Sequence, residues 1–147
     1  MSSFTRPLQG TFASNGLHFT LAESFEYYTD IKPPCDRPEG AATKGGDRWT
    51  IHVPAGLETD FASVPRLLWS IAPPVGLHSK AAVLHDYLYA ENLGSRKWAD
   101  RVFLEAMKVS GVRWTRRRLY YRMVRLFGWI AWRGHARGKK KETSDAG

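Results

Sequence analysis

Three ionisable side chains lie in two stretches of the sequence whose apolar residues recur with helical spacing. His85 and Asp86 are adjacent in "AAVLHDYLYA", and Asp100 follows in "KWADRVFLEAM", within the apolar arc of its helix. A carboxylate that faces a core needs a partner, because an unpaired buried charge is costly. A hydrogen bond from His85 to Asp100 would fix the imidazole tautomer and raise its basicity. The pattern therefore indicates a candidate general base.

The neighbours of His85 allow two interpretations. Asp86 would point about 100° away from His85 around the helix, where it could ligate a hard cation through oxygen. Tyr89 follows one turn after His85 on the same side. The structural alternative is a brace, since buried His–Asp pairs also lock helices together and Asp86 could pair with Lys80 or Arg66. The residues alone leave both interpretations open.

Helices are expected to position these side chains in the second half of the chain. We predict them over roughly 78–92, 96–109 and 116–132. Ser95 and Thr115 have the residue types of N-caps for the second and third helices, and Gly111 is expected to end the second. The connection "ENLGS" is short, so the first two helices should be antiparallel neighbours. Asp100 would then meet His85, whereas Arg101 and Glu105 should be solvated.

The first half of the chain has the alternation typical of strands. "SNGLHFTL" combines an Asn15-Gly16 turn signal with alternating apolar residues, and "SFEYYT" and "RWTIHVP" are further β-prone runs. The Pro/Gly-rich stretch between the last two is expected to be a surface loop. We predict an α+β fold, with a small antiparallel sheet packed against three C-terminal helices. One domain would cover 1–134, and 135–147 would form a disordered basic tail.

A tight turn is expected around "ETDFASVPR", between the strands and the helices. Asp60 or Ser63 could cap a short helix over 64–71, with Arg66 bracing the junction. Alternatively, Asp60 could lie beside His85 as an additional metal-binding carboxylate. A Ser63–His85 nucleophile pair ranks below these readings because Ser63 has no nucleophile-elbow context.

The chain is basic, and its basicity is concentrated near the C-terminus. Of 22 Lys and Arg residues, 11 fall in 113–141, which holds no Asp or Glu, and the formal net charge is +8. In the third helix we expect a buried arc of Leu119, Tyr120, Met123, Phe127 and Ile130. Arg118, Arg122, Arg125 and Arg133 would lie together on another flank. That flank could bind phosphates of lipid or nucleic acid, or it could be an ordinary solvated face.

Composition excludes several classes of protein. The hydrophobic share is 43%, which argues against disorder, and one cysteine permits no intrachain disulfide. No signal peptide or membrane-spanning segment is evident, so we expect a soluble protein made in a cytoplasm. No base-reading motif is present, and sequence-specific DNA binding is not expected.

Four ordered stretches carry a resemblance that covers residues 17–128. They are "VPAGLETDFASVPRLLW", "PPVGLHSKAAVLHDYLY", "SRKWADRVFLEAMKVSGV" and "YRMVRLFGW". Together they resemble the phage and prophage family catalogued as domain of unknown function 1353. The resemblance implies a bacteriophage or prophage origin and no particular reaction. It also implies synthesis in the cytoplasm of a bacterial host, with incorporation in the phage virion as a further possibility.

A second resemblance covers only 82–107. "HDYLY" followed by "ADRVF" is similar to the His-Asp-x-x-Tyr motif and downstream Asp of phospholipase A2 enzymes, especially the disulfide-free viral type. It implies that His85 is the general base, Asp86 binds Ca²⁺, Asp100 orients His85, and Tyr89 supports the pair. The chain departs from that family in lacking a clear Gly-rich calcium loop, and the spacing from His85 to Asp100 is short.

These patterns lead to three functional hypotheses. The first is a small hydrolase with a His85–Asp100 pair, metal-assisted, acting on phospholipid. The second is a non-catalytic virion, tail or assembly module in which His85, Asp86 and Asp100 are structural and the partner is another phage protein. The third is a binder of anionic surfaces through the C-terminal arginines.

Overall fold

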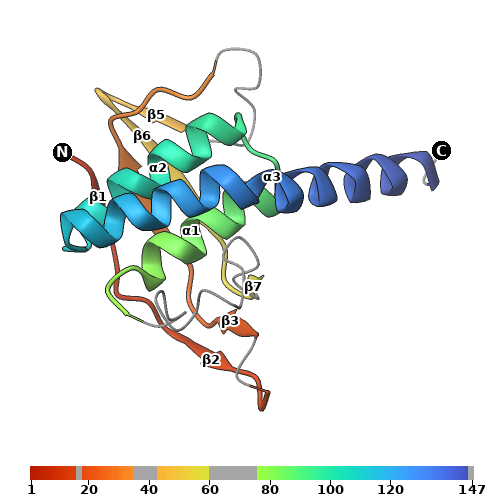
Figure 1. Ribbon diagram of the computed structural model, residues 1–147, viewed down its shortest axis with the longest axis horizontal. Helices are drawn as coiled ribbons and strands as arrows, with labels where there is room; N and C mark the ends of the chain where they lie inside the picture. Colours follow the sequence, from red (N-terminus) through yellow and green to blue (C-terminus); the bar gives the residue numbers. More distant parts are fainter. Residues whose placement is uncertain (16–17, 35–42, 60–75, 146–147) are drawn as a thin grey trace.

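The computed structural model describes residues 1–15, 18–34, 43–59 and 76–145 (Figure 1). Two antiparallel sheets occupy the N-terminal half, and three helices occupy the C-terminal half. The α+β class predicted from the sequence is confirmed. The strands form two sheets, where the sequence had suggested one.

The larger sheet has the strand order β1-β4-β6-β5. Its members are β1 (Ser3–Phe4), β4 (Phe25–Thr29), β6 (Arg48–Val53) and β5 (Thr43–Gly45). The central pair β4–β6 aligns Tyr27 with Ile51, and both side chains are buried. The alternation in "FEYYT" therefore places one face of β4 in the core, as its period of two requires. β5 lies inside the stretch that the sequence had suggested was entirely loop.

The smaller sheet has the order β2-β3-β7. It contains β2 (Gly10–Phe12), β3 (Phe19–Leu21) and β7 (Glu58–Thr59). β2 and β3 pair from Gly10↔Leu21 to Phe12↔Phe19, on either side of the predicted Asn15-Gly16 turn. β7 pairs with β3 and brings Thr59 toward the helices.

The helices are α1 (Ser79–Ala90), α2 (Arg96–Val109) and α3 (Trp114–Asp145). The Ser95 hydroxyl accepts a hydrogen bond from the Trp98 N–H, which confirms the predicted cap of α2. Gly111, with φ +81°, follows the end of α2 in a conformation that favours glycine. Among the described residues, no helix is long and apolar enough to cross a membrane.

The sequence misplaced both ends of α3. The helix begins at Trp114, so Thr115 lies inside it rather than capping it. It also runs on to Asp145, through residues that had been expected to form a disordered tail. Residues 135–145 include three consecutive lysines and no proline, so no strong helix breaker interrupts a continuous helix there. The division of the chain into a domain ending at 134 stays a prediction.

The buried side of α3 also differs from the predicted arc. Tyr120 and Met123 are buried as expected, but Leu119, Phe127 and Ile130 are exposed. Val124 and Gly128 occupy the buried side in their place. Several arcs of α3 are apolar, so periodicity does not identify the buried one.

The core lies between the larger sheet and the helices. Tyr27 and Thr29 of β4 both donate hydrogen bonds to Glu105 Oε1 of α2, at 2.9 and 2.7 Å. The Trp98 indole N–H donates to the Ile31 carbonyl at 3.1 Å. The prediction that Glu105 is solvated is therefore wrong, because the sheet packs against that side of α2. α1 packs against both α2 and α3, and so it has few exposed positions.

Candidate functional site

Asp100 is the centre of a buried polar cluster at which the three helices meet. His85 Nε2 of α1 lies 2.8 Å from Asp100 Oδ1, and the Tyr89 hydroxyl donates to the same oxygen at 2.5 Å. Arg125 Nη1 of α3 donates to Asp100 Oδ2 at 2.7 Å. Arg96, one turn before Asp100 on α2, lies 3.9 Å from Oδ2. The structure thus brings His85, Tyr89 and Asp100 together as the sequence predicted.

This cluster is enclosed by the packing of the helices. The side-chain exposed fractions are 1% for His85 and 0% for Asp100. The His85 ring also packs against the rings of Tyr89 and Phe103, with centroids 4.1 and 4.7 Å apart. Within the described part of the chain, aromatic rings therefore cover these sides of the imidazole, and the carboxylates of Asp100 and Asp86 lie near its two nitrogens.

The hydrogen bonds keep Asp100 ionised. Burial alone would raise the pKa of the Asp100 carboxyl, but hydrogen bonds with His85, Tyr89 and Arg125 outweigh it, and the net pKa is lowered. Burial and the adjacent carboxylate raise the pKa of the Tyr89 hydroxyl, which stays a donor. The hydrogen bond with Asp100 raises the pKa of Arg125. The negative charge of Asp100 is therefore balanced by the Arg125 guanidinium and by hydrogen bonds with His85 and Tyr89.

The position of Asp100 determines the role of each imidazole nitrogen. An ionised carboxylate only accepts hydrogen bonds, so we assign the proton on Nε2 to the bond with Asp100. In the neutral ring, Nδ1 then carries the lone pair. Nδ1 lies 4.0 Å from Asp86 Oδ1, on the side of the ring away from Asp100. The arrangement provides an oriented base whose basic nitrogen lies next to Asp86.

Asp86 is anchored by the smaller sheet. Its Oδ2 accepts a hydrogen bond from the Thr59 hydroxyl of β7, and its side chain keeps 14% of its surface exposed. Sequence reasoning missed Thr59, because the contact depends on the pairing of β7 with β3. Asp60, which the sequence suggested as a second metal-binding carboxylate, lies outside the described residues, as do Ser63 and Arg66.

The described residues alone do not fit a calcium ion. Ca²⁺ takes six to eight oxygen ligands, and Asp86 supplies a single carboxylate. In the part of the chain that the structure describes, no group of three or more His, Cys, Asp or Glu side chains could hold a metal ion. No step of the chemistry is therefore assigned to a metal.

The four arginines that the sequence placed on one flank of α3 separate into two groups. Arg125 donates to the buried Asp100 carboxylate, a contact that the sequence did not predict, and its role in binding anions stays a prediction. Arg118, Arg122 and Arg133 are exposed. The sequence missed Arg125 because its partner depends on which side of α3 is buried. Arg96 could have been found from its i, i+4 spacing with Asp100.

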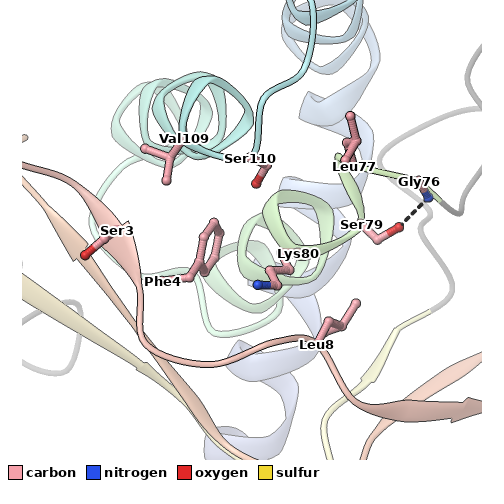
Figure 2. Close-up of a pocket in the computed structure, with 9 residues that line it drawn as sticks. All are labelled: Ser3, Phe4, Leu8, Gly76, Leu77, Ser79, Lys80, Val109 and Ser110. Carbon is pink, nitrogen blue, oxygen red and sulfur yellow. Dashed lines mark hydrogen bonds between the residues drawn. The ribbon is translucent and has the colours of Figure 1, made fainter.

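A separate cavity of about 610 Å³ lies between β1, the start of α1 and the end of α2. Figure 2 shows Phe4, Leu8 and Lys80 around it, with the Gly76 N–H donating to the Ser79 hydroxyl. The Lys80 ammonium lies 5.3 Å from the centre of the Phe4 ring. None of the lining residues belongs to the Asp100 cluster, so this cavity is not the opening of that site.

Comparisons with known proteins identify relatives of this chain. It is 33% identical over 85 residues to "Uncharacterized protein y4jT" of Sinorhizobium fredii, a match that covers 56% of this chain and 25% of that protein. The chain thus spans about a quarter of the length of this curated relative. No solved structure gives a significant match. Residues 39–124 match the family described as "Protein of unknown function (DUF1353)", in agreement with the resemblance carried by the quoted motifs. The chain is a member of this family.

Proposed function

We propose that the protein is a hydrolase in which His85 activates a water molecule, and that its substrate is a phospholipid ester. One observation carries the proposal: Asp100 holds His85 through Nε2, so that Nδ1 lies on the opposite side of the ring, 4.0 Å from Asp86 Oδ1. A general base needs this combination of an oriented ring and a basic nitrogen next to a polar group. A brace would need only the first of these.

The chemistry follows from these positions. Nδ1 takes a proton from water while the water oxygen attacks the ester carbonyl carbon. Asp100 then stabilises the imidazolium, and Arg125 keeps the carboxylate from taking up that proton itself. The imidazolium returns the proton to the departing alkoxide as the ester bond breaks. The products are a carboxylic acid and an alcohol, and no other reactant is consumed.

The choice of a phospholipid rests on the resemblance to phospholipase A2. That resemblance implies a base at His85, an orienting carboxylate at Asp100 and a supporting hydroxyl at Tyr89. The distances of 2.8 and 2.5 Å to Asp100 Oδ1 are consistent with these roles. A phage or prophage setting, which the family resemblance implies, would place the activity in infection or host lysis.

Hydrolysis requires that a water molecule reach Nδ1 of His85. His85 is almost wholly buried, whereas Asp86 keeps part of its carboxylate surface exposed. Water and substrate would therefore approach Nδ1 along Asp86 and Thr59. The chain continues from Thr59 directly into the "DFASVPR" stretch, whose residues would then be the nearest in sequence to the entrance.

The burial of the cluster favours a second candidate function. Asp100 and His85 are enclosed, and their hydrogen bonds join α1, α2 and α3. The same residues would then brace the fold of a non-catalytic phage module that acts by binding another virion or assembly protein. In this case the cluster contributes stability and no turnover.

One experiment separates the two candidates. Purified protein is incubated with a panel of phospholipids with added Ca²⁺, with Mg²⁺ and with a chelator, and fatty acid release is measured. His85→Gln and Asp86→Asn should abolish release while the circular dichroism spectrum stays native. His52→Gln is the matched control, because His52 is exposed on β6 and distant in sequence from the cluster.

If the buried cluster only stabilises the fold, the same experiment should give a different result. Wild-type protein would release no fatty acid under any of these conditions, and His85→Gln would only lower the melting temperature. That result would reject the hydrolase and support the structural function.

A further inference from the structure

The side of α3 that faces away from the other helices carries an exposed apolar stripe. It consists of Leu119, Leu126 and Ile130, and the exposed fractions of the last two are 66% and 59%. At about 100° per residue the three positions fall within about 40° of one another around the helix. Exposed aliphatic side chains that share one line of a helix form a candidate interaction surface.

A basic stripe runs beside the apolar one. Arg118, Arg122 and Arg133 are exposed and fall within about 60° of one another on the flank next to Leu126. Trp129 lies among them and is exposed, with the Arg133 guanidinium 5.2 Å from the centre of its ring. No acidic residue occurs in 113–141, so nothing within α3 over this stretch neutralises these arginines.

The position of α3 leaves this surface available. Figure 1 shows the first part of α3 lying across α1 and α2, and its C-terminal part extending beyond the rest of the molecule. The packed side is the one with Tyr120, Val124 and Gly128. The two stripes therefore lie on the opposite side, along a part of the helix that packs on α1 and α2.

We propose that these two stripes bind the surface of an anionic lipid bilayer, with α3 lying parallel to the membrane. The arginines would pair with lipid phosphates, while Leu126, Ile130 and Trp129 enter the boundary between headgroups and acyl chains. A helix with basic residues on one flank and Leu or Trp on the other has the character of an interfacial membrane helix. Trp side chains favour this boundary because they combine an apolar ring with a polar N–H.

Two other occupants fit the surface less well. A nucleic acid would pair with the arginines, but it offers no apolar groove for the aliphatic stripe. A second copy of the chain would cover the stripe, but it would bring like-charged arginines together. The combination of charge and exposed aliphatic side chains therefore favours a lipid surface.

Vesicle sedimentation tests the proposal and requires no turnover, so its result is independent of the proposed hydrolysis. The full chain is mixed with vesicles of phosphatidylcholine alone, or of phosphatidylcholine and phosphatidylglycerol in equal parts. We expect binding to the mixed vesicles only, weakening as salt is raised. Brominated lipids should quench the tryptophan emission, and this quenching should decrease in Trp129→Phe.

Variants assign the binding to the two stripes. The triple variant Arg118→Gln, Arg122→Gln, Arg133→Gln should bind mixed vesicles about 100-fold more weakly, since each basic residue near an anionic surface contributes roughly fivefold. The double variant Leu126→Ser, Ile130→Ser should lose about tenfold or more. All five positions are exposed, so the melting temperature should stay unchanged.

A charge-matched control lies on α2. Lys97, Arg101 and Lys108 are exposed there, and changing all three to Gln removes the same charge as the α3 triple variant. This control should bind vesicles almost as well as the wild type. Equal losses in the two triple variants would show that net charge alone governs binding, which overturns the proposal.

Two further outcomes would also overturn it. One is a wild-type protein that does not sediment with mixed vesicles. The other is tighter binding to a DNA duplex than to vesicles, with no effect of Leu126→Ser, Ile130→Ser on the DNA complex. That second result would assign the arginines to nucleic acid instead.

Discussion

Gly128 of α3 lies directly against the Tyr89 hydroxyl of α1. A β-carbon at position 128 would be 2.6 Å from that oxygen, closer than real contacts allow. The hydroxyl is not free to move away, because it donates to Asp100 at 2.5 Å. The close approach of two helices and the hydrogen bonding of the candidate site are thus determined by the same pair of residues.

This contact predicts an unusual effect of Gly128→Ala. Alanine is the better helix former by about 1 kcal/mol, yet here its methyl group would displace Tyr89 from Asp100. We expect the free energy of unfolding to fall by about 1–3 kcal/mol, measured by urea denaturation. Gly134→Ala is the control in the same helix, where nothing lies within 4 Å, and it should be neutral or stabilising. If Gly128→Ala and Gly134→Ala both stabilised the protein, the close contact between Gly128 and Tyr89 would be contradicted.

Arg125 and Arg122 lie one turn apart on α3 but should respond differently to substitution. Arg125 donates to the buried Asp100 carboxylate at 2.7 Å, whereas Arg122 is exposed. Arg125→Gln should lower the unfolding free energy by about 1–2 kcal/mol, because the buried Asp100 carboxylate loses a charged hydrogen-bond donor. The loss is not larger because solvent screens the partly exposed guanidinium. Arg122→Gln should stay within about 0.5 kcal/mol of the wild type. Thermal denaturation of the two variants side by side measures the difference.

The His85–Asp100 pair could be predicted from the sequence because the information is local. Helical spacing places Asp100 in an apolar arc, and a short connection makes α1 and α2 neighbours. The Arg125 partner could not be predicted in this way. It depends on which side of α3 is buried, and the apolar residues of α3 spread over several sides. Gly128 marks the buried side, but its role is visible only once Tyr89 is in place.

For the strands too, local patterns could be predicted from the sequence, whereas non-local pairing could not. Alternating residues in "FEYYT" and "RWTIHV" predict β4 and β6, and their register follows from the burial of one face. β1, β5 and β7 have two or three residues each, too few for a periodic signal. Their pairing is non-local, so the division into two sheets could not be read from the chain. The same applies to the bond between Thr59 and Asp86.

Glu105 should be important for joining the larger sheet to α2. Its Oε1 accepts from the hydroxyls of Tyr27 and Thr29, both of which are fully buried. Glu105→Ala would leave two buried donors without this acceptor, and we expect a loss of about 2–4 kcal/mol. Arg101→Ala on the exposed side of α2 is the control and should change stability little. If Tyr27→Phe combined with Thr29→Val largely removes the effect of Glu105→Ala, the hydroxyls are its cause.

The ionisation of the Asp100 carboxyl group should make the stability of the protein depend on pH. Its pKa in the folded protein lies below the ordinary value of 3.8, so the folded state favours the ionised carboxylate more than the unfolded state does. The resulting stability is fully present above about pH 4 and is lost as pH falls from there through the lower folded pKa. Asp100→Asn has no such group and should be about 3 kcal/mol less stable than the wild type at neutral pH.

The difference between the wild type and Asp100→Asn should therefore be constant from neutral pH to about pH 4 and shrink below it. Urea denaturation at several pH values measures this difference directly. Asp47→Asn provides the matched control, because Asp47 is exposed in the turn between β5 and β6 and its removal should change stability little at any pH. A difference that stays constant on acidification below pH 4 would mean that Asp100 does not carry its charge in the folded protein. The assignment of Nε2 as the protonated nitrogen of His85 would then fail with it.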